Sequence, residues 1–189
     1  MPKGSPASSK TRHDVMAINE KQRKGRAANA VAELLVRKLL VPKVYMGPKG
    51  LRIFLKPEFE LNENPWVDVL AIDRAGSGDT HGVMIDLSPR KDLDQASFED
   101  YLKFYIAKAA IHFKYIAVDT NSIAFISKQG LFADDGIGRI GIIEVIENPS
   151  GPPEAKIIIP PERFRVKRQW IEEFDRFQRE TPADMEIRG

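Results

Sequence analysis

Two acidic residues stand inside strongly apolar stretches near the middle of the chain. Asp68 lies within WVDVLAID, and Asp86 lies within HGVMIDLS, after a glycine-containing turn. Side chains alternate between the two faces of a strand, and a carboxylate among Val, Leu, Ile and Met is costly to bury without a partner. A metal ion is the usual partner, so Asp68 and Asp86 are predicted as metal ligands.

Each acid also has a simpler interpretation. Asp68 could be a hydrogen-bonded acid of the core, and Asp86 could start a turn, because Leu87, Ser88 and Pro89 follow it. The three histidines have no ligand-like spacing and the chain has no cysteine, so a zinc site is not expected. Hard carboxylate oxygens suit Mg²⁺ or Mn²⁺ instead.

Charge is strongly segregated along the chain. Residues 1–56 hold 13 Lys or Arg against 3 Asp or Glu, a net charge of +10, so a whole-chain charge of +2 leaves −8 for the remainder. Such segregation predicts a surface for a polyanion, most commonly nucleic acid, with an anionic membrane, an acidic protein or a merely solvated basic tail as alternatives. The cations predicted to bind nucleic acid include Lys21, Arg23, Lys24 and Arg26.

Length and composition predict one soluble domain. The chain has 189 residues with 42% apolar content, and no stretch approaches the roughly 20 apolar residues of a membrane span. The N-terminus lacks the apolar core of a signal peptide, so a cytoplasmic protein without a membrane partner is expected. The predicted organisation is a disordered basic arm (1–13), a core domain (14–160), and a C-terminal amphipathic helix with a tail (161–189).

Apolar periodicity predicts helices and strands in a definite order. The expected elements are one or two helices over 14–40 with a break near Gly25, strands LRIFLK and EFELN, the two acid-bearing strands, a helix over 94–113, strands YIAVD, SIAFIS, RIGIIEVIE and KIIIPP, and a last helix from 161 or 162 to about 180. This order predicts an α/β fold in which a central mixed sheet is flanked by helices.

The order of these motifs resembles the restriction-endonuclease-like, or PD-(D/E)XK, nuclease superfamily over roughly residues 25–147. The first helix, the two acid-bearing strands, FEDYLKFYIAKAAIHF, YIAVDT and GLFADDGIGRIGII carry the resemblance, which is nearest to small bacterial DNA-repair-type members. It implies an αβββαβ core and cleavage of DNA phosphodiester bonds with Mg²⁺ or Mn²⁺. Asp68 matches the first catalytic acid of the family, and Asp86 matches the second.

Two positions depart from the family pattern. The family has a Lys two residues after the second acid, where this chain has Ser88. Another lysine would have to replace it, and the candidates are Lys91, Lys103 and Lys108. Lys108 is predicted as the catalytic residue. Asn29 in KGRAAN stands where active relatives have a Glu, and Glu33, one turn later, is predicted as the third metal ligand, with Glu58 or Glu60 as alternatives. Ser88 and Lys91 complete the predicted nucleic-acid contacts.

Three functions therefore remain open. The chain could be a metal-dependent nuclease, a catalytically inactive relative that binds nucleic acid within a larger assembly, or a structural protein whose basic arm orders on a partner. A homo-oligomer or a larger complex is expected by analogy alone.

Overall fold

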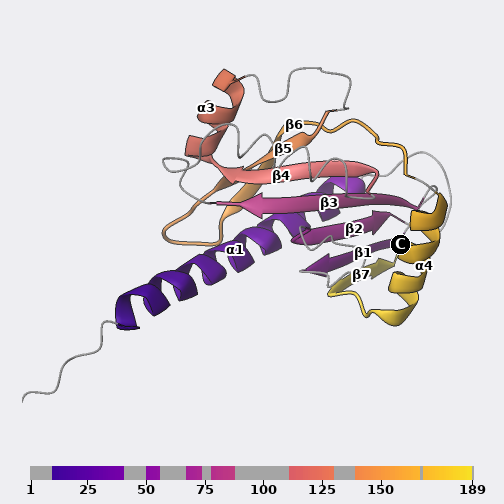
Figure 1. Cartoon of the computed structure of the whole chain (residues 1–189), viewed down its shortest axis with the longest axis horizontal. Helices are drawn as coiled ribbons and strands as arrows, with labels where there is room; N and C mark the ends of the chain where they lie inside the picture. Colours follow the sequence, from indigo (N-terminus) through magenta and orange to yellow (C-terminus); the bar gives the residue numbers. More distant parts are fainter. Residues whose placement is uncertain are drawn as a thin grey trace, which may run out of the picture.

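The computed structural model describes residues 10–40, 50–55, 67–73, 78–87, 111–129, 139–166 and 168–188. The described elements, in chain order, are α1 (Lys10–Leu39), β1 (Gly50–Leu55), β2 (Val69–Asp73), β3 (Asp79–Asp86), β4 (Phe113–Asp119), α3 (Thr120–Gln129), β5 (Gly141–Ile146), β6 (Glu154–Ile159), α4 (Arg168–Glu180) and β7 (Met185–Arg188). This confirms the predicted α/β class, with helices against a mixed sheet (Figure 1).

The described strands form one seven-stranded sheet in the order β6-β5-β4-β3-β2-β1-β7. The neighbours β3, β4 and β5 run parallel, whereas the pairs β1/β2, β2/β3, β5/β6 and β1/β7 are antiparallel. The centre of the sheet is therefore parallel, so the carboxyl ends of β3, β4 and β5 meet at one edge. We call this row of strand ends the carboxyl edge, as distinct from the edge strands β6 and β7.

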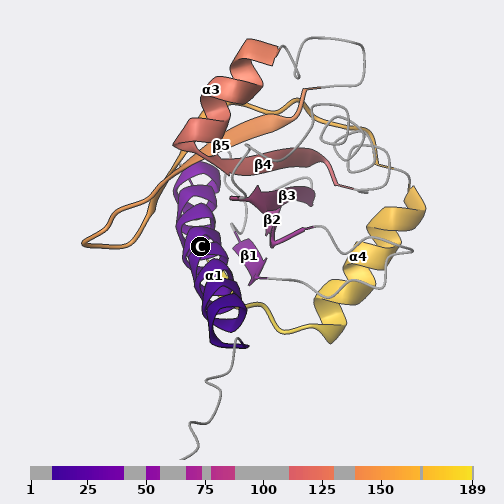
Figure 2. The same cartoon turned by 60° about the vertical axis from the view of Figure 1, so that its left-hand side comes forward.

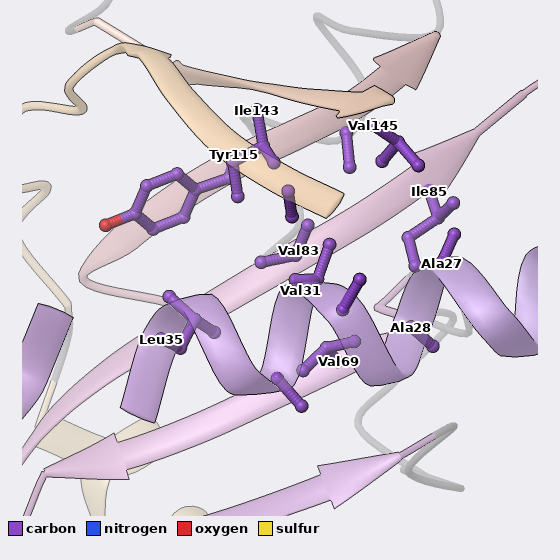
Figure 3. Packing of buried hydrophobic residues seen from close by; sticks show 14 of the residues in the cluster. Ala27, Ala28, Val31, Leu35, Val69, Val83, Ile85, Tyr115, Ile143 and Val145 are labelled. Atoms are coloured by element: carbon purple, nitrogen blue, oxygen red, sulfur yellow. The ribbon is translucent and has the colours of Figure 1, made fainter. Parts of the chain in front are cut away.

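Helix α1 packs on one face of the sheet through small and branched side chains. Ala27, Val31 and Leu35, spaced at four residues, are fully buried, together with Ala28 (Figure 3). They contact a sheet surface that includes Val69, Val83, Ile85, Tyr115, Ile143 and Val145. Alanine lets the helix axis approach the sheet closely and has the highest helix propensity, so the same residues favour both the helix and its docking.

The opposite face of the sheet carries α4, so α1 and α4 lie on different sides (Figure 2). The ring of Phe177 packs on Phe54 of β1 with centroids 4.9 Å apart. The buried guanidinium of Arg52 donates to the carbonyl oxygens of Gln178 and Thr181, at the C-terminal end of α4 where helix carbonyls lack intrahelical partners. The C-terminal segment is thus built into the same domain as the rest of the sheet.

The first helix differs from the sequence prediction in two ways. It begins at Lys10 rather than Asp14, within the arm predicted to be disordered, and it continues through Gly25 without a break. Glycine inside a helix costs about 1 kcal/mol relative to alanine. The contacts that α1 makes with the sheet on both sides of Gly25 offset this cost, which the sequence pattern alone does not show.

The prediction of a strand at SIAFIS is wrong, because these residues belong to α3. Asp119, the last residue of β4, accepts the amide N–H of Ser122 at 2.8 Å through its Oδ1, which is the hydrogen bond of a helix N-cap. Ile126 is fully buried among side chains of the face opposite α1. The N-cap therefore starts a helix where the β-branched composition indicated a strand.

The C-terminal part also differs from the prediction. Helix α4 begins at Arg168 rather than at 161 or 162, and the short strand β7, which was not predicted, adds to β1 at the edge of the sheet. The helix predicted over 94–113 lies mostly outside the described residues, but its last predicted residue, Phe113, is the first of β4. The predicted strand EFELN lies outside the described residues.

Residues 160–166 cross the amino ends of β5, β4 and β3 as an extended strap. The amide N–H of Glu162 donates to the carbonyl oxygen of Arg139 at 2.8 Å, and the amide N–H of Phe164 donates to the carbonyl oxygen of His112 at 2.7 Å. Arg163 donates through two nitrogens to Asp79 Oδ1, at 3.1 and 2.8 Å. The strap thus holds the amino ends of the three parallel strands together before the chain enters α4.

A buried histidine lies beneath this strap. The Nδ1 atom of His112 is 3.0 Å from Thr80 Oγ1 and accepts the amide N–H of Thr80 at 3.2 Å, while the amide of His112 donates back to Thr80 Oγ1 at 3.1 Å. An Nδ1 that accepts a hydrogen bond belongs to a neutral ring. Burial lowers the pKa of His112, against a smaller opposing effect of Asp79 and with a further lowering by Arg163.

Acidification should therefore destabilise the fold through His112. The native pKa lies below the unfolded value of 6.5, so the unfolded chain binds more protons as the pH falls below that value. We expect the free energy of unfolding to drop in this range, with a limiting slope of about 1.4 kcal/mol per pH unit for one proton. Denaturant titrations of the wild type and His112→Gln between pH 5 and 8 measure it; an equal pH slope in both proteins would assign the effect to another group.

Candidate functional site

Asp68 lies immediately before β2, at the carboxyl edge, and both of its carboxylate oxygens have partners. Its Oδ2 accepts the amide N–H of Ile85 at 2.7 Å, and its Oδ1 is 2.8 Å from Lys24 Nζ in α1. The main-chain N–H of Asp68 donates to the carbonyl oxygen of Val83 at 2.9 Å. The carboxylate thus acts as an acceptor for β3 beyond the end of the β2/β3 pairing and as an anchor for α1.

Asp86 is the last residue of β3 and is directed to the other face of the sheet. Val83, Ile85 and Leu87 belong to the cluster that α1 covers, whereas Met84 belongs to the cluster on the opposite face. Strand alternation places Asp86 with Met84. The two predicted catalytic acids therefore share the carboxyl edge, where Asp68 pairs with Lys24 of α1.

Arg23 joins the carboxyl ends of all three parallel strands. Its Nε donates to Glu147 Oε1 at 2.7 Å, and a terminal nitrogen donates to the carbonyl of Leu87 at 3.2 Å. The other terminal nitrogen is 3.8 Å from Asp119 Oδ2. Leu87 follows β3, Asp119 ends β4, and Glu147 follows β5, so one guanidinium of α1 connects the three strands.

The other predicted site residues in the described part of the chain lie on the outer side of α1. Lys21 and Glu33 are exposed, and Arg26, also exposed, donates to the carbonyl of Gly151 in the turn between β5 and β6. Glu33 is nine residues, about two and a half helical turns, from Lys24, so it projects away from Asp68. Ser88, Lys91 and Lys108 lie outside the described residues.

The described side chains do not form a ligand set for a divalent cation. Within the described ranges, no group of three or more acidic or histidine side chains could hold a metal ion. Asp68 already has a positive partner without a metal ion, because the Lys24 ammonium lies 2.8 Å from its Oδ1. The geometry found at Asp68 is that of a partly buried ion pair, in which Asp68 is 15% exposed and Lys24 is 41% exposed.

The sequence interpretation overlooked the acids that end the other two parallel strands. Asp119 closes YIAVD, and Glu147 directly follows the strand that ends at Ile146. With Asp86, an acid thus stands at the end of each of β3, β4 and β5. This repeated position was the available signal, because parallel strands bring their carboxyl ends together.

A buried lysine lies apart from this edge. Lys114 of β4 is 3% exposed, on the face opposite α1 with Ile116 and Val118, and its Nζ is 4.5 Å from the centroid of the Phe164 ring. Burial lowers the pKa of Lys114 to about 8. Its place near the amino ends of the strands, beneath the strap, separates it from Asp68.

No known family model matches the chain, and no curated protein is significantly similar to it. No helix within the described residues is long and apolar enough to span a membrane.

The contact between Asp68 and Lys24 can be measured by a double-mutant cycle. We expect a coupling of about 0.5–1 kcal/mol between Asp68→Asn and Lys24→Gln, decreasing with added salt, because Lys24 is partly exposed. Asp68→Ala should cost more than Asp68→Asn, since alanine also removes the acceptor for the Ile85 amide. Urea denaturation of the four proteins of the cycle gives these values, and zero coupling at low salt would contradict the ion pair.

Proposed function

We propose that the chain is a nucleic-acid-binding domain, with DNA as its ligand, and that α1 provides the binding surface. The charge segregation carries this proposal: residues 1–56 hold a net charge of +10, and α1 lies within them. A cationic surface attracts phosphates and releases the counterions condensed on the nucleic acid. The proposal of DNA rests on the resemblance described above.

The shape of α1 supports this proposal. The helix has 30 residues, which corresponds to a length of about 45 Å, and its N-terminal part projects beyond the sheet (Figure 1). A cationic helix that stands clear of the domain can approach a large anionic partner without a clash with the sheet. Lys21, Arg37 and Lys38 are exposed on it.

The order of the elements is also consistent with the resemblance. After α1, the neighbours β1, β2 and β3 form an antiparallel meander, and β4 then joins β3 in parallel. The αβββαβ core that the resemblance implies has this succession of strands. Its second helix would fall in residues 88–110, which lie outside the described part of the chain.

Binding to DNA should depend steeply on salt. The logarithm of the affinity for a mixed-sequence duplex should fall linearly with the logarithm of the salt concentration, by about 0.9 for each phosphate contact. Replacing Lys21 by Gln should reduce this slope by about 1 in fluorescence anisotropy titrations. Arg179→Gln is the control, because Arg179 is exposed on α4, on the other side of the sheet; absent or salt-independent binding would contradict the proposal.

A second candidate function is phosphodiester hydrolysis with Mg²⁺ or Mn²⁺. One observation favours it: the carboxylate of Asp68 stands at the start of β2 beside the end of β3, with the Lys24 ammonium 2.8 Å away. In the family that the chain resembles, the lysine after the second acid supplies a positive charge to the active site. Here the Lys24 ammonium beside Asp68 would supply that charge. The described residues alone do not complete a metal site.

The hydrolase candidate predicts cleavage of DNA in the presence of Mg²⁺ or Mn²⁺. Cleavage should be lost in Asp68→Ala and strongly reduced in Lys24→Gln, whereas Glu33→Gln should cleave normally, because Glu33 projects away from Asp68. Gel assays with supercoiled and linear DNA at several metal concentrations test this. Full cleavage by Asp68→Ala would remove Asp68 from the reaction, and DNA binding without cleavage by the wild type would leave only the first proposal.

A further inference from the structure

The cations of α1 divide between two faces of the helix. Arg23 and Lys24 face the carboxyl edge, where their charges are matched by Glu147, Asp119 and Asp68. These two cations hold α1 in place, so they are poorly available for phosphates. A nucleic acid that binds α1 must therefore contact its other, outer face.

The outer face carries a continuous row of exposed polar side chains. The row has the spacing i, i+4, i+7, i+11 and i+15 and consists of Gln22, Arg26, Asn29, Glu33 and Arg37. This spacing follows one side of an α-helix. Gln22 and Asn29 are exposed on this side, and the turn between β5 and β6 reaches it at Arg26.

The first three members of the row have the chemistry that distinguishes bases. Glutamine and asparagine pair with the donor and acceptor of adenine in the major groove, and arginine pairs with the two acceptors of guanine. Gln22, Arg26 and Asn29 span about 10 Å along the helix. This length lets the three side chains reach neighbouring base pairs along the groove.

Arg26 is already oriented by a second element. Its guanidinium donates to the carbonyl of Gly151 in the turn between β5 and β6. This bond uses one of the five N–H donors of the guanidinium. The remaining donors of Arg26 are on a side chain whose position is restricted, which lowers the entropic cost of a specific contact.

Charge along the row indicates which part of α1 makes the contact. Glu33 would repel phosphates next to the C-terminal part of the row, whereas the cations Lys21 and Arg26 lie N-terminal to it. The segment from Lys21 to Asn29 is therefore the part best matched to DNA.

We propose that Gln22, Arg26 and Asn29 form a base-reading surface for the major groove of double-stranded DNA, so that α1 confers sequence preference. This inference rests on the proposed function and adds the form of the ligand and the reading residues. A helix is about 10–12 Å in diameter and fits the major groove of B-DNA, which is about 12 Å wide. The deep, narrow major groove of double-stranded RNA does not admit it.

Selection from a pool of random-sequence DNA duplexes tests the proposal. The wild-type chain should enrich a short motif, and Asn29→Ala and Gln22→Ala should each lose roughly tenfold discrimination at one position of that motif. Both residues are exposed, so the variants should fold, which circular dichroism and thermal unfolding verify. Lys21→Gln is the matched control: it should weaken binding to all sequences equally and leave the motif unchanged.

The outcomes separate this inference from the proposed function. Duplex binding without an enriched motif, or a motif that both alanine variants retain, would overturn the base-reading role and leave nucleic-acid binding intact. Preference for single strands or for RNA duplexes would likewise overturn it. Failure of the wild type to bind any nucleic acid would overturn the proposed function itself.

Discussion

The docking of α1 on the sheet is the contact on which the rest of the arrangement depends. Buried alanines let the helix lie close to β2, β3 and β5, and Arg23 and Lys24 fix it at the carboxyl edge. Apolar burial provides most of the attraction, because partly exposed ion pairs contribute little. The ion pairs instead fix where along its length and in which rotation the helix docks.

This docking explains why the basic residues of α1 are not equivalent. A helix with a cation at nearly every turn presents some of them to the acids that end the parallel strands and leaves the others in solvent. The inner cations offset the repulsion among Asp68, Asp119 and Glu147, which would otherwise accumulate at one edge. The outer ones remain available for an anionic partner.

The other end of the parallel strands, where β3, β4 and β5 begin, is held by different contacts. There the strap at 160–166 bonds to the main-chain carbonyls of His112 and Arg139, just before β4 and β5, and the neutral ring of His112 bonds to Thr80. Neutral hydrogen bonds suit this edge because the groups are buried. The charged groups near it, Asp79 and Arg163, pair with each other at the surface.

The sequence determined the elements whose signals are local. Periodicity predicted α1, the paired acid-bearing strands, β4, β5 and β6, and composition located the positive charge in the first 56 residues. It also singled out Asp68 as an acid that needs a partner, and the structure provides Lys24 and the amide of Ile85, whereas the metal ion expected there stays a prediction. These inferences held because helix and strand periods are properties of neighbouring residues.

Only the tertiary structure decided which groups meet. It turned Glu33 away from Asp68, placed Arg23 among three strand ends, and made a helix of SIAFIS through the cap at Asp119. The rotation of α1 about its axis sets which cations face inward, and that rotation follows from packing between segments that are distant in the chain. No local pattern encodes it, because the free energy that selects it belongs to the contact between α1 and the whole sheet.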